Sequence, residues 1–225
     1  MGVVLLHSGI TDARQWDRER AEWPFDCVAP DLHEGVELSE PCVLVGNSFG
    51  GRVALEQAVL HPELVQALVL VAPALPGFDT GEELAAADAR EEELYEAGDY
   101  AGAAQLMVET WVPAAQPAVQ AYVREAQEHA YTQPPPTWLP RLDPPLAERL
   151  GEIRVPVLLV DGALDQPAFH RITDLLESEL PDVRGRVAVD GAHHLPNLER
   201  PAEFDAAVLP FLETILEKGE RGLTP

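Results

Sequence analysis

Six short apolar runs, each followed by a polar or helical stretch, constrain the fold of this chain more than any other feature. Each run has the length and β-branched content typical of a buried strand. The runs are residues 2–7, 25–30, 41–47, 67–73, 155–162 and 186–191. Helical spacing of apolar residues predicts helices over 49–60, 167–180 and 201–217. Strands that alternate with helices predict an α/β fold with a mostly parallel sheet and flanking helices.

Residues 76–149 interrupt this alternation. They contain DTGEELAAADAREEELYEAGDYAGAAQLMVETW and PAVQAYVREAQEHAY, which predict several helices, and then a proline-rich piece at 133–145, which predicts an irregular return. Open α/β sheets bind ligands at the carboxyl ends of their strands, where an inserted helical segment would cover the site. We therefore predict an α/β core formed by 1–75 and 150–225, with a helical lid insertion formed by 76–149.

The formal net charge of −24 argues against two classes of partner. Nucleic acids and anionic membrane surfaces attract basic patches, so we expect no nucleic-acid and no membrane partner. The start MGVVLLHSG has no basic flank and a short apolar run, which predicts a cytoplasmic protein. Cys27 and Cys42 each lie in or beside a strand-like run, as is typical of buried thiols in a reducing compartment.

The third apolar run ends in GNSFGG, residues 46–51, and helical spacing follows at once. A strand that turns directly into a helix passes through a strained residue, and small neighbours leave its side chain and backbone NH groups accessible. Gly-x-Ser-x-Gly is the pattern of a nucleophile elbow, although a serine in such a turn can also be a simple helix cap. A role for Ser48 as a nucleophile therefore requires a histidine base and a carboxylate elsewhere in the chain.

Two later strand ends carry such partners. The stretch VPVLLVDGALDQP ends in Asp161 and Asp165, and VAVDGAHHLPNLERP places His193 and His194 after another strand. The order serine, aspartate, histidine is the one expected for α/β-hydrolases. The residues alone leave two choices open for each partner, although Asp161 lies closer to its strand and favours a turn-forming role.

Three motifs together resemble the α/β-hydrolase fold superfamily. They are LLHSG with Trp16 downstream, VGNSFGG, and GALDQP followed by GAHHLPNLERPAEF. The resemblance extends over nearly the whole chain and is weakest through 76–149. It implies that Ser48 is the nucleophile, Asp165 the triad acid and His194 the base, because the family's usual Gly-Ala-Gly-His corresponds here to Gly-Ala-His-His.

Acyl transfer also needs hydrogen-bond donors for the developing oxyanion. The first expected donor is the backbone NH of Phe49, next after the serine. The start His-Ser-Gly-Ile is similar to the family's His-Gly-x pattern, which implies Gly9 as the second donor, with Ile10 as the alternative. His7 is expected to hold this loop by hydrogen bonds. The expected substrate contacts are Ile10, Asn47, Trp111 and Trp138, with core packing as the alternative for the tryptophans.

The chain departs from the family in two places. Family members usually have two further strands before the one that carries His-Gly, whereas 3–6 here follow Met1 almost directly. The ten positions 31–40 are too few for a helical crossover, so we expect one sheet-covering helix to be lost or reduced to a turn. Apolar surface exposed by that loss would be buried by a second copy of the chain, which predicts a homodimer.

The predicted function is a serine hydrolase that cleaves a small or medium carboxylic ester, lactone or thioester through an acyl-enzyme on Ser48. The resemblance is to small esterases and enol-lactonases, and it implies a small-molecule acyl substrate, no cofactor and no metal. Two alternatives stay open: a carbon-carbon bond hydrolase or haloperoxidase-like enzyme with the same triad, and a non-catalytic α/β-hydrolase-fold ligand receptor. The acidic run at 88–93 is expected on the solvated face of a lid helix.

Overall fold

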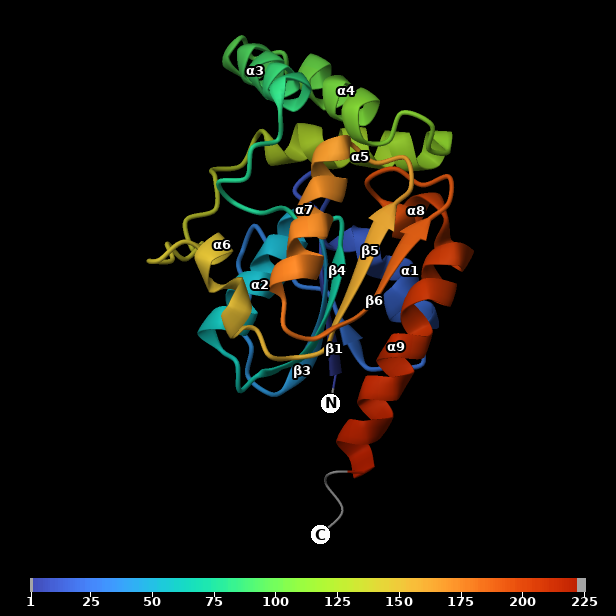
Figure 1. The fold of residues 1–225 in the computed structure, drawn as a ribbon. Coiled ribbons are helices and arrows are strands. Elements are labelled where there is room, and N and C mark those ends of the chain that lie inside the picture. Colours follow the sequence, from blue (N-terminus) through green and yellow to red (C-terminus); the bar gives the residue numbers. More distant parts are fainter. Residues whose placement is uncertain (1, 222–225) are drawn as a thin grey trace.

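The computed structural model describes residues 2–221, within which six strands form a sheet in the order β2-β1-β3-β4-β5-β6 (Figure 1). Each neighbouring pair of strands is parallel. The strands are β1 (Gly2–Leu6), β2 (Cys27–Val28), β3 (Cys42–Asn47), β4 (Val65–Val71), β5 (Val157–Gly162) and β6 (Val183–Val189). The predicted α/β fold with a mostly parallel sheet is confirmed. β6 begins earlier than predicted because Val183 already pairs with Val157.

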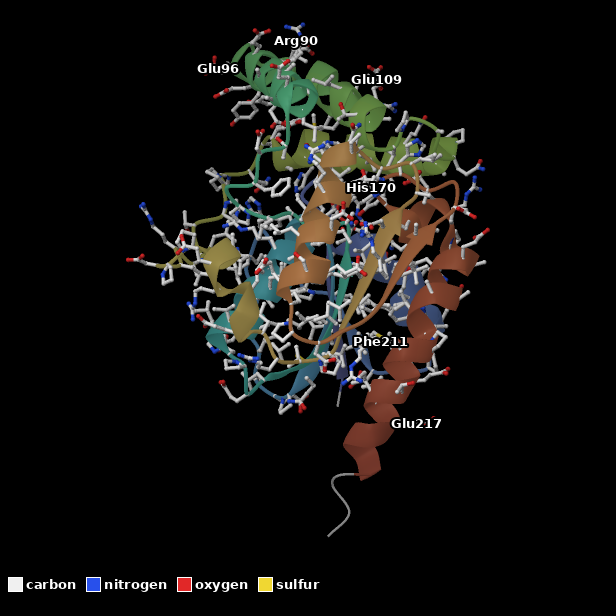
Figure 2. The ribbon with its side chains drawn as sticks, in the orientation of Figure 1. Arg90, Glu96, Glu109, His170, Phe211 and Glu217 are labelled. Carbon is white, nitrogen blue, oxygen red and sulfur yellow. The ribbon has the colours of Figure 1, made fainter. Side chains whose placement is uncertain are left out.

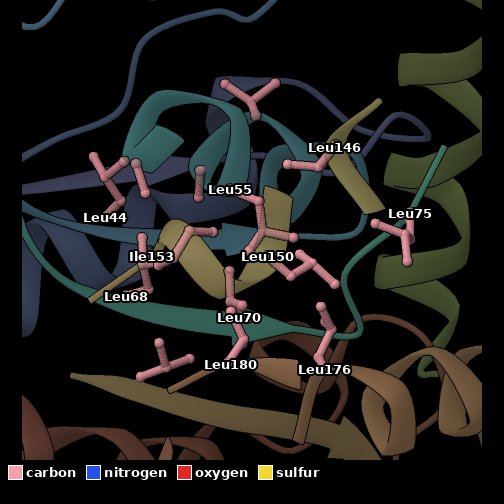
Figure 3. Close-up of a cluster of buried hydrophobic side chains, with 14 of the residues drawn as sticks. Leu44, Leu55, Leu68, Leu70, Leu75, Leu146, Leu150, Ile153, Leu176 and Leu180 are labelled. Carbon is pink, nitrogen blue, oxygen red and sulfur yellow. The ribbon is translucent and has the colours of Figure 1, made fainter. Parts of the chain in front are cut away.

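Helices cover both faces of the sheet. Successive side chains of a strand point to opposite faces, and both sets are apolar here, so both faces must be buried. One face packs against α2 (Phe49–Leu60), α6 (Leu146–Arg149), the 3-10 helix Leu150–Glu152 and α7 (Pro167–Glu179). Leu44, Leu68 and Leu70 from the sheet meet Leu55, Leu150 and Leu176 in this layer (Figure 3). The other face packs against the 3-10 helix Ala13–Trp16, α1 (Asp17–Glu22) and α9 (Pro201–Arg221).

The segment between β4 and α6 contains three helices that lie beyond the carboxyl ends of the strands (Figure 1). They are α3 (Glu82–Glu96), α4 (Tyr100–Trp111) and α5 (Pro117–Ala130), and residues 131–145 return to the core without a helix or strand. A small apolar cluster, with Met107 and Val123 on the helices and Ile10 and Leu195 on the core, joins the two parts. The role of this segment as a lid stays a prediction.

Two surface features bear on possible partners. Residues 31–40 contain turns and no helix, which confirms the expected loss of a sheet-covering helix, and Val28 on the edge strand β2 is 54% exposed. The homodimer stays a prediction.

Charged side chains such as Arg90, Glu96 and Glu109 project from the outer side of the helical segment (Figure 2). Within the described residues, we find no helix with the length and apolar character to span a bilayer.

Candidate active site

The turn between β3 and α2 has the strained geometry of a nucleophile elbow. Ser48 lies at its tip with φ 53° and ψ −110°, a conformation that residues with a side chain rarely adopt. A Cβ on Gly46 would overlap the backbone of Gly50, and a Cβ on Gly50 would overlap the carbonyl of Leu6. The two glycines are therefore needed because the elbow packs directly on itself and on β1. The amide of Ser48 donates to the carbonyl of Val71 at 2.8 Å, which ties the elbow to β4.

Asp165 follows β5, His194 follows β6, and the two side chains form a hydrogen-bonded pair. Nδ1 of His194 lies 2.8 Å from Oδ2 of Asp165, and both side chains are buried. Because a carboxylate accepts, Nδ1 carries the shared proton and Nε2 is left to accept another. The imidazole packs against the rings of Trp111 and Phe169, whose centroids are each 4.4 Å from its own and 5.4 Å from each other. These contacts fix both the tautomer and the position of the ring.

Ser48 and His194 line one cavity with a volume of about 250 Å³. The rest of its wall comes from the loop after β1 and from α3, α4, α5 and α7: Ser8, Gly9, Ile10, Asp88, Glu91, Met107, Trp111, Gln127 and Phe169. Among the described residues, no hydrogen bond of 3.5 Å or less joins the Ser48 hydroxyl to His194. Such bonds are often long in unliganded enzymes and shorten when substrate binds. The cavity thus brings the predicted nucleophile and base to a common space.

The carboxylate of Glu199, in the short helix α8 (Pro196–Glu199), holds the loop that carries His194. Its Oε1 accepts from the amides of His193 and Leu195, each at 3.0 Å, and its Oε2 lies 3.1 Å from Nδ1 of His193. These two amides flank His194 on both sides. The ring of His193 is engaged by this carboxylate and is not among the residues that line the cavity, which favours His194 as the base.

The loop after β1 lies against the start of α2. A Cβ placed on Gly9 would lie 3.5 Å from Cβ of Phe49, so the two expected oxyanion donors belong to adjacent backbone segments. The amide of Ile10 is 3.4 Å from Oγ of Ser8. This contact is long for a hydrogen bond, so Gly9 stays the predicted second donor, with Ile10 as the alternative.

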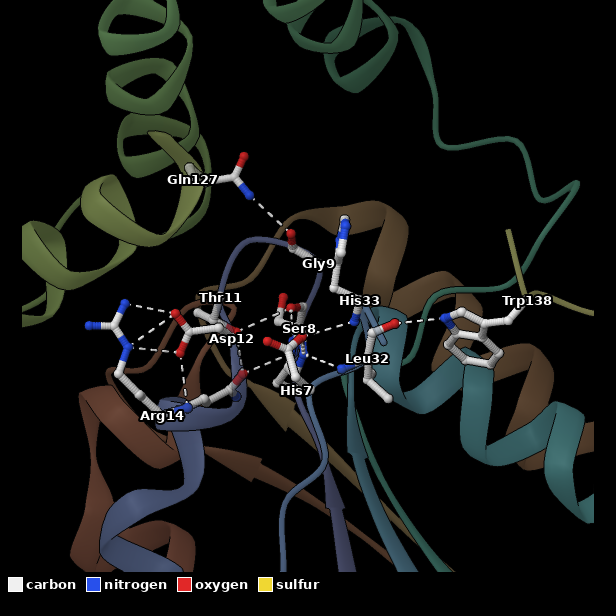
Figure 4. Close-up of polar contacts among 12 residues, drawn as sticks. His7, Ser8, Gly9, Thr11, Asp12, Arg14, Leu32, His33, Gln127 and Trp138 are labelled. Carbon is white, nitrogen blue, oxygen red and sulfur yellow. Dashed lines mark hydrogen bonds and ion pairs between the residues drawn. The ribbon is translucent and has the colours of Figure 1, made fainter. Parts of the chain in front are cut away.

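His7 and Gln127 fix this loop from two sides (Figure 4). Nδ1 of His7 donates to the carbonyl of Ser8 at 2.8 Å, and its Nε2 accepts from the amide of Leu32 at 2.9 Å. Nε2 of Gln127, on α5, donates to the carbonyl of Gly9 at 2.9 Å. His7 thus holds the loop by hydrogen bonds, as expected from the sequence, and α5 contributes a contact that the sequence did not indicate.

A buried polar network joins the three loops of the site. Nε2 of Gln15 donates to Oδ1 of Asn47 at 2.8 Å and to Oδ1 of Asn197 at 3.1 Å. Oε1 of Gln15 accepts from the amide of Ser8 at 2.8 Å. Nδ2 of Asn47 in turn donates to the carbonyl of His194 at 3.1 Å. Gln15 therefore connects the loop after β1, the elbow and the loop that carries His194 from behind the cavity.

Two residues expected to contact substrate are placed elsewhere. Asn47 is fully buried behind the elbow, because it is the last residue of β3 and its amide is engaged by the network. The indole NH of Trp138 donates to the carbonyl of Leu32 at 2.8 Å (Figure 4), and its ring packs against Gly35. Neither lines the cavity that contains Ser48, whereas Ile10 and Trp111 both do.

Asp161 occupies a separate buried site. Its Oδ1 accepts from the hydroxyl of Thr173 at 2.6 Å, and its Oδ2 accepts from Nε of Arg186 at 3.2 Å. Burial raises the pKa of this carboxyl, and the two donors oppose that rise. Asp161 is thus engaged by Thr173 and Arg186, whereas Asp165 is hydrogen-bonded to His194. This difference favours Asp165 over Asp161 as the triad acid.

Most of the acidic run on α3 is exposed, as the sequence predicts, and within residues 88–93 Glu91 alone is half-buried. Asp88 and Glu91 line the cavity of Ser48, and the hydroxyl of Tyr131 donates to Glu91 at 2.6 Å. Burial raises the pKa of both carboxyl groups. Within residues 2–221, no cluster of three His, Cys, Asp or Glu side chains is arranged to hold a metal ion.

A parallel sheet with a strained serine elbow after its third strand, and with a histidine paired to a carboxylate after its last two, defines the α/β-hydrolase class. The model of the alpha/beta hydrolase family matches residues 31–207, and the chain belongs to this family. A protein named "Putative carbamate hydrolase RutD" from Cronobacter turicensis is 29% identical over 209 residues, which cover 88% of this chain and 73% of that protein.

Solved structures show the same fold. The carboxylesterase CesB (YbfK) from Bacillus subtilis superposes with a TM-score of 0.72 at 20% identity, covering 94% of this chain and 83% of that one. MenH from S. aureus superposes with a TM-score of 0.72 at 21% identity, covering 96% of this chain and 94% of that one. Est816, described as an N-acyl homoserine lactone degrading enzyme, gives 0.70 at 19% identity, with 94% and 93% covered. Similarity at this level of identity establishes the fold, and the substrate must be inferred from the site.

Proposed function

We propose that this protein is a serine hydrolase that cleaves a small or medium carboxylic ester, lactone or thioester. The observation that carries the proposal is the hydrogen-bonded pair of His194 and Asp165, which opens onto the same cavity as the strained Ser48. A free serine hydroxyl is a weak nucleophile at neutral pH, and an oriented histidine base is what activates it. The hydrolases among the relatives support the same reaction class.

The proposed reaction follows from the roles of these groups. Nε2 of His194 takes the hydroxyl proton of Ser48 as Oγ attacks the substrate carbonyl. The amides of Phe49 and Gly9 stabilise the negative charge that develops on the carbonyl oxygen. His194 then returns the proton to the leaving group, and water hydrolyses the acyl-enzyme with His194 again acting as base. Asp165 keeps the imidazole in the tautomer that this sequence needs.

Labelling with a fluorophosphonate probe tests the proposal directly. Peptide mass spectrometry should find the label on Ser48, and the Ser48→Ala variant should not be labelled. A panel of nitrophenyl esters, lactones, thioesters and carbamates would then define the acyl substrate, with carbamates included because of the relative named for that activity. Folded protein that is neither labelled nor active on any member of the panel would contradict the proposal and favour a ligand receptor.

The carbon-carbon bond hydrolases and haloperoxidase-like enzymes form the second class that this triad allows. Asp88 and Glu91 on the cavity wall argue against a dienoic acid substrate, because its carboxylate would be repelled at close range. Cleavage of a dienoic diketone faster than of any ester in the panel would support that alternative.

A further inference from the structure

A second and larger cavity, of about 660 Å³, lies beside the one that contains Ser48. Gly9 lines both cavities, so the two cavities meet at the loop after β1 that contains Gly9. The larger cavity is formed by the loops after β1 and β2, by α5, and by the return segment, and neither Ser48 nor His194 is among its lining residues. Its volume lies in the range of pockets that enclose a small-molecule ligand.

The order of the strands places this cavity on one side of the nucleophile. Ser48 follows β3, the larger cavity is lined by residues that follow β1 and β2, and Asp165 and His194 follow β5 and β6. In this sheet β1 and β2 lie on the opposite side of β3 from β5 and β6. A substrate with its carbonyl at Ser48 therefore has one end toward His194 and the other toward the larger cavity.

The chemistry of the proposed reaction decides which end is which. His194 must donate a proton to the leaving group, so the leaving group lies on the His194 side, in the smaller cavity. We propose that the larger cavity binds the acyl part of the substrate. The assignment rests on the proposed function, and it predicts a bulky acyl group combined with a small leaving group.

The lining of the larger cavity indicates an uncharged acyl group. Its apolar and aromatic residues are Leu32, Phe49, Tyr95, Ala126, Ala130, Tyr131, Pro135 and Pro136. Asp31 and Glu34 add carboxylates, and a third carboxylate at Asp12 is paired with Arg14 at 2.7 Å. The lining includes no Lys or Arg side chain, and its basic side chains are the histidines His7, His33 and His129, of which His7 is already bonded to Ser8 and Leu32. An acyl group that ends in a carboxylate would meet like charge with no permanent cation to bind it. A ring or a short alkyl chain fits this lining.

Two small side chains on α5 keep the cavity open. Ala126 and Ala130 lie one helical turn apart and both face the cavity. A large side chain at position 130 would fill this space without touching Ser48 or His194. Ala121 lies on the same helix but is exposed and does not line the cavity, which makes it a matched control position.

The test compares two isomeric esters. Methyl 4-phenylbutanoate carries its phenyl group on the acyl side, and 3-phenylpropyl acetate carries it on the leaving-group side. We expect kcat/KM to be at least about tenfold higher for the methyl ester, since burying a ring is worth more than 1.4 kcal/mol. Monomethyl adipate, which ends in a carboxylate, should be hydrolysed at least about tenfold less efficiently than methyl hexanoate.

Variants then locate the preference. Ala130→Trp should lower the ratio of kcat/KM for methyl 4-phenylbutanoate to that for methyl acetate by about tenfold or more, and Ala121→Trp should leave it unchanged. Equal rates for the isomers, a preference for the acetate, or a ratio unmoved by Ala130→Trp would overturn the cavity assignment while labelling at Ser48 still upheld the hydrolase. The isomer comparison uses the wild-type protein, so it holds even if Ala130→Trp fails to fold. Loss of both labelling and turnover would instead refute the hydrolase and the cavity assignment together.

Discussion

Replacing Glu199 is expected to displace His194, the proposed base, without touching it. Its carboxylate accepts from the amides on both sides of His194, at 3.0 Å each, and its side chain is buried. Glu199→Ala would leave two backbone donors without this acceptor, and each unsatisfied buried donor costs about 1–3 kcal/mol. We therefore expect a loss of about 2–4 kcal/mol in the free energy of unfolding. A base misplaced by about 1 Å lowers the rate by about 100-fold, so kcat should fall by about 10- to 100-fold.

Two measurements separate positioning from general destabilisation. Urea unfolding gives the stability, and the rate of fluorophosphonate labelling at Ser48 reports activation of the serine in protein shown to be folded. Glu199→Gln retains one acceptor oxygen and should lie between wild type and Glu199→Ala in both. Glu203→Ala, which removes an exposed carboxylate a few residues later, is the control and should change neither. Folded Glu199→Ala with an unchanged labelling rate would refute the reasoning.

Three further substitutions test other parts of the structure. Gln15→Met keeps the length of a buried side chain but removes the side-chain hydrogen bonds of Gln15 to Ser8, Asn47 and Asn197, and thermal unfolding should show a loss of about 2–4 kcal/mol. A loss below about 0.5 kcal/mol would contradict a stabilising role for these bonds. Burial raises the pKa of Glu19, so wild-type stability should fall as pH rises from the ordinary glutamate pKa through the raised value. Glu19→Gln removes that fall, so the free energy of unfolding of the variant relative to wild type should be higher at pH 7 than at pH 4 when both are measured by urea unfolding. The same difference at both pH values would contradict a raised pKa of Glu19. Gly50→Ala should cost at least about 3 kcal/mol or prevent folding, because its Cβ would overlap a carbonyl of β1, whereas Gly151→Ala, which has open space, should fold normally.

The sequence predicts the sheet well because a parallel strand buried on both faces is a continuous apolar run. The same property predicts the candidate site, since Ser48, Asp165 and His194 each follow such a run, and the carboxyl ends of parallel strands meet at one edge. The resemblance implied Asp165 rather than Asp161 as the triad acid, whereas the pattern of the residues alone left both open. Both lie near the end of β5, and the bonds of Asp161 to Thr173 and of Asp165 to His194, which periodicity does not reveal, favour Asp165.

The supporting residues were missed for a common physical reason. Gln15 and Glu199 are polar side chains in short helical stretches, where a buried residue and a solvated one give the same local pattern. Asp88 and Glu91 lie three positions apart and share one face of α3. The local pattern does not tell whether that face meets solvent or the cavity, because tertiary packing fixes its neighbour. Phe169 left no signal beyond an apolar position on a helix. Buried polar partners become visible when distant segments are brought together.

The two residues that flank Ser48 in the elbow serve opposite sides of the site. The side chain of Asn47 points away from the cavities and bonds to Gln15 and to the carbonyl of His194. Phe49 lines the larger cavity, and its amide is the first proposed oxyanion donor. A substitution at 47 should therefore act on stability and on the position of the base, whereas a substitution at 49 should act on the choice of acyl group. The pattern Gly-x-Ser-x-Gly allows any residue at both positions. In this fold position 47 must fit the buried hydrogen-bond network, whereas position 49 must fit the wall of the larger cavity.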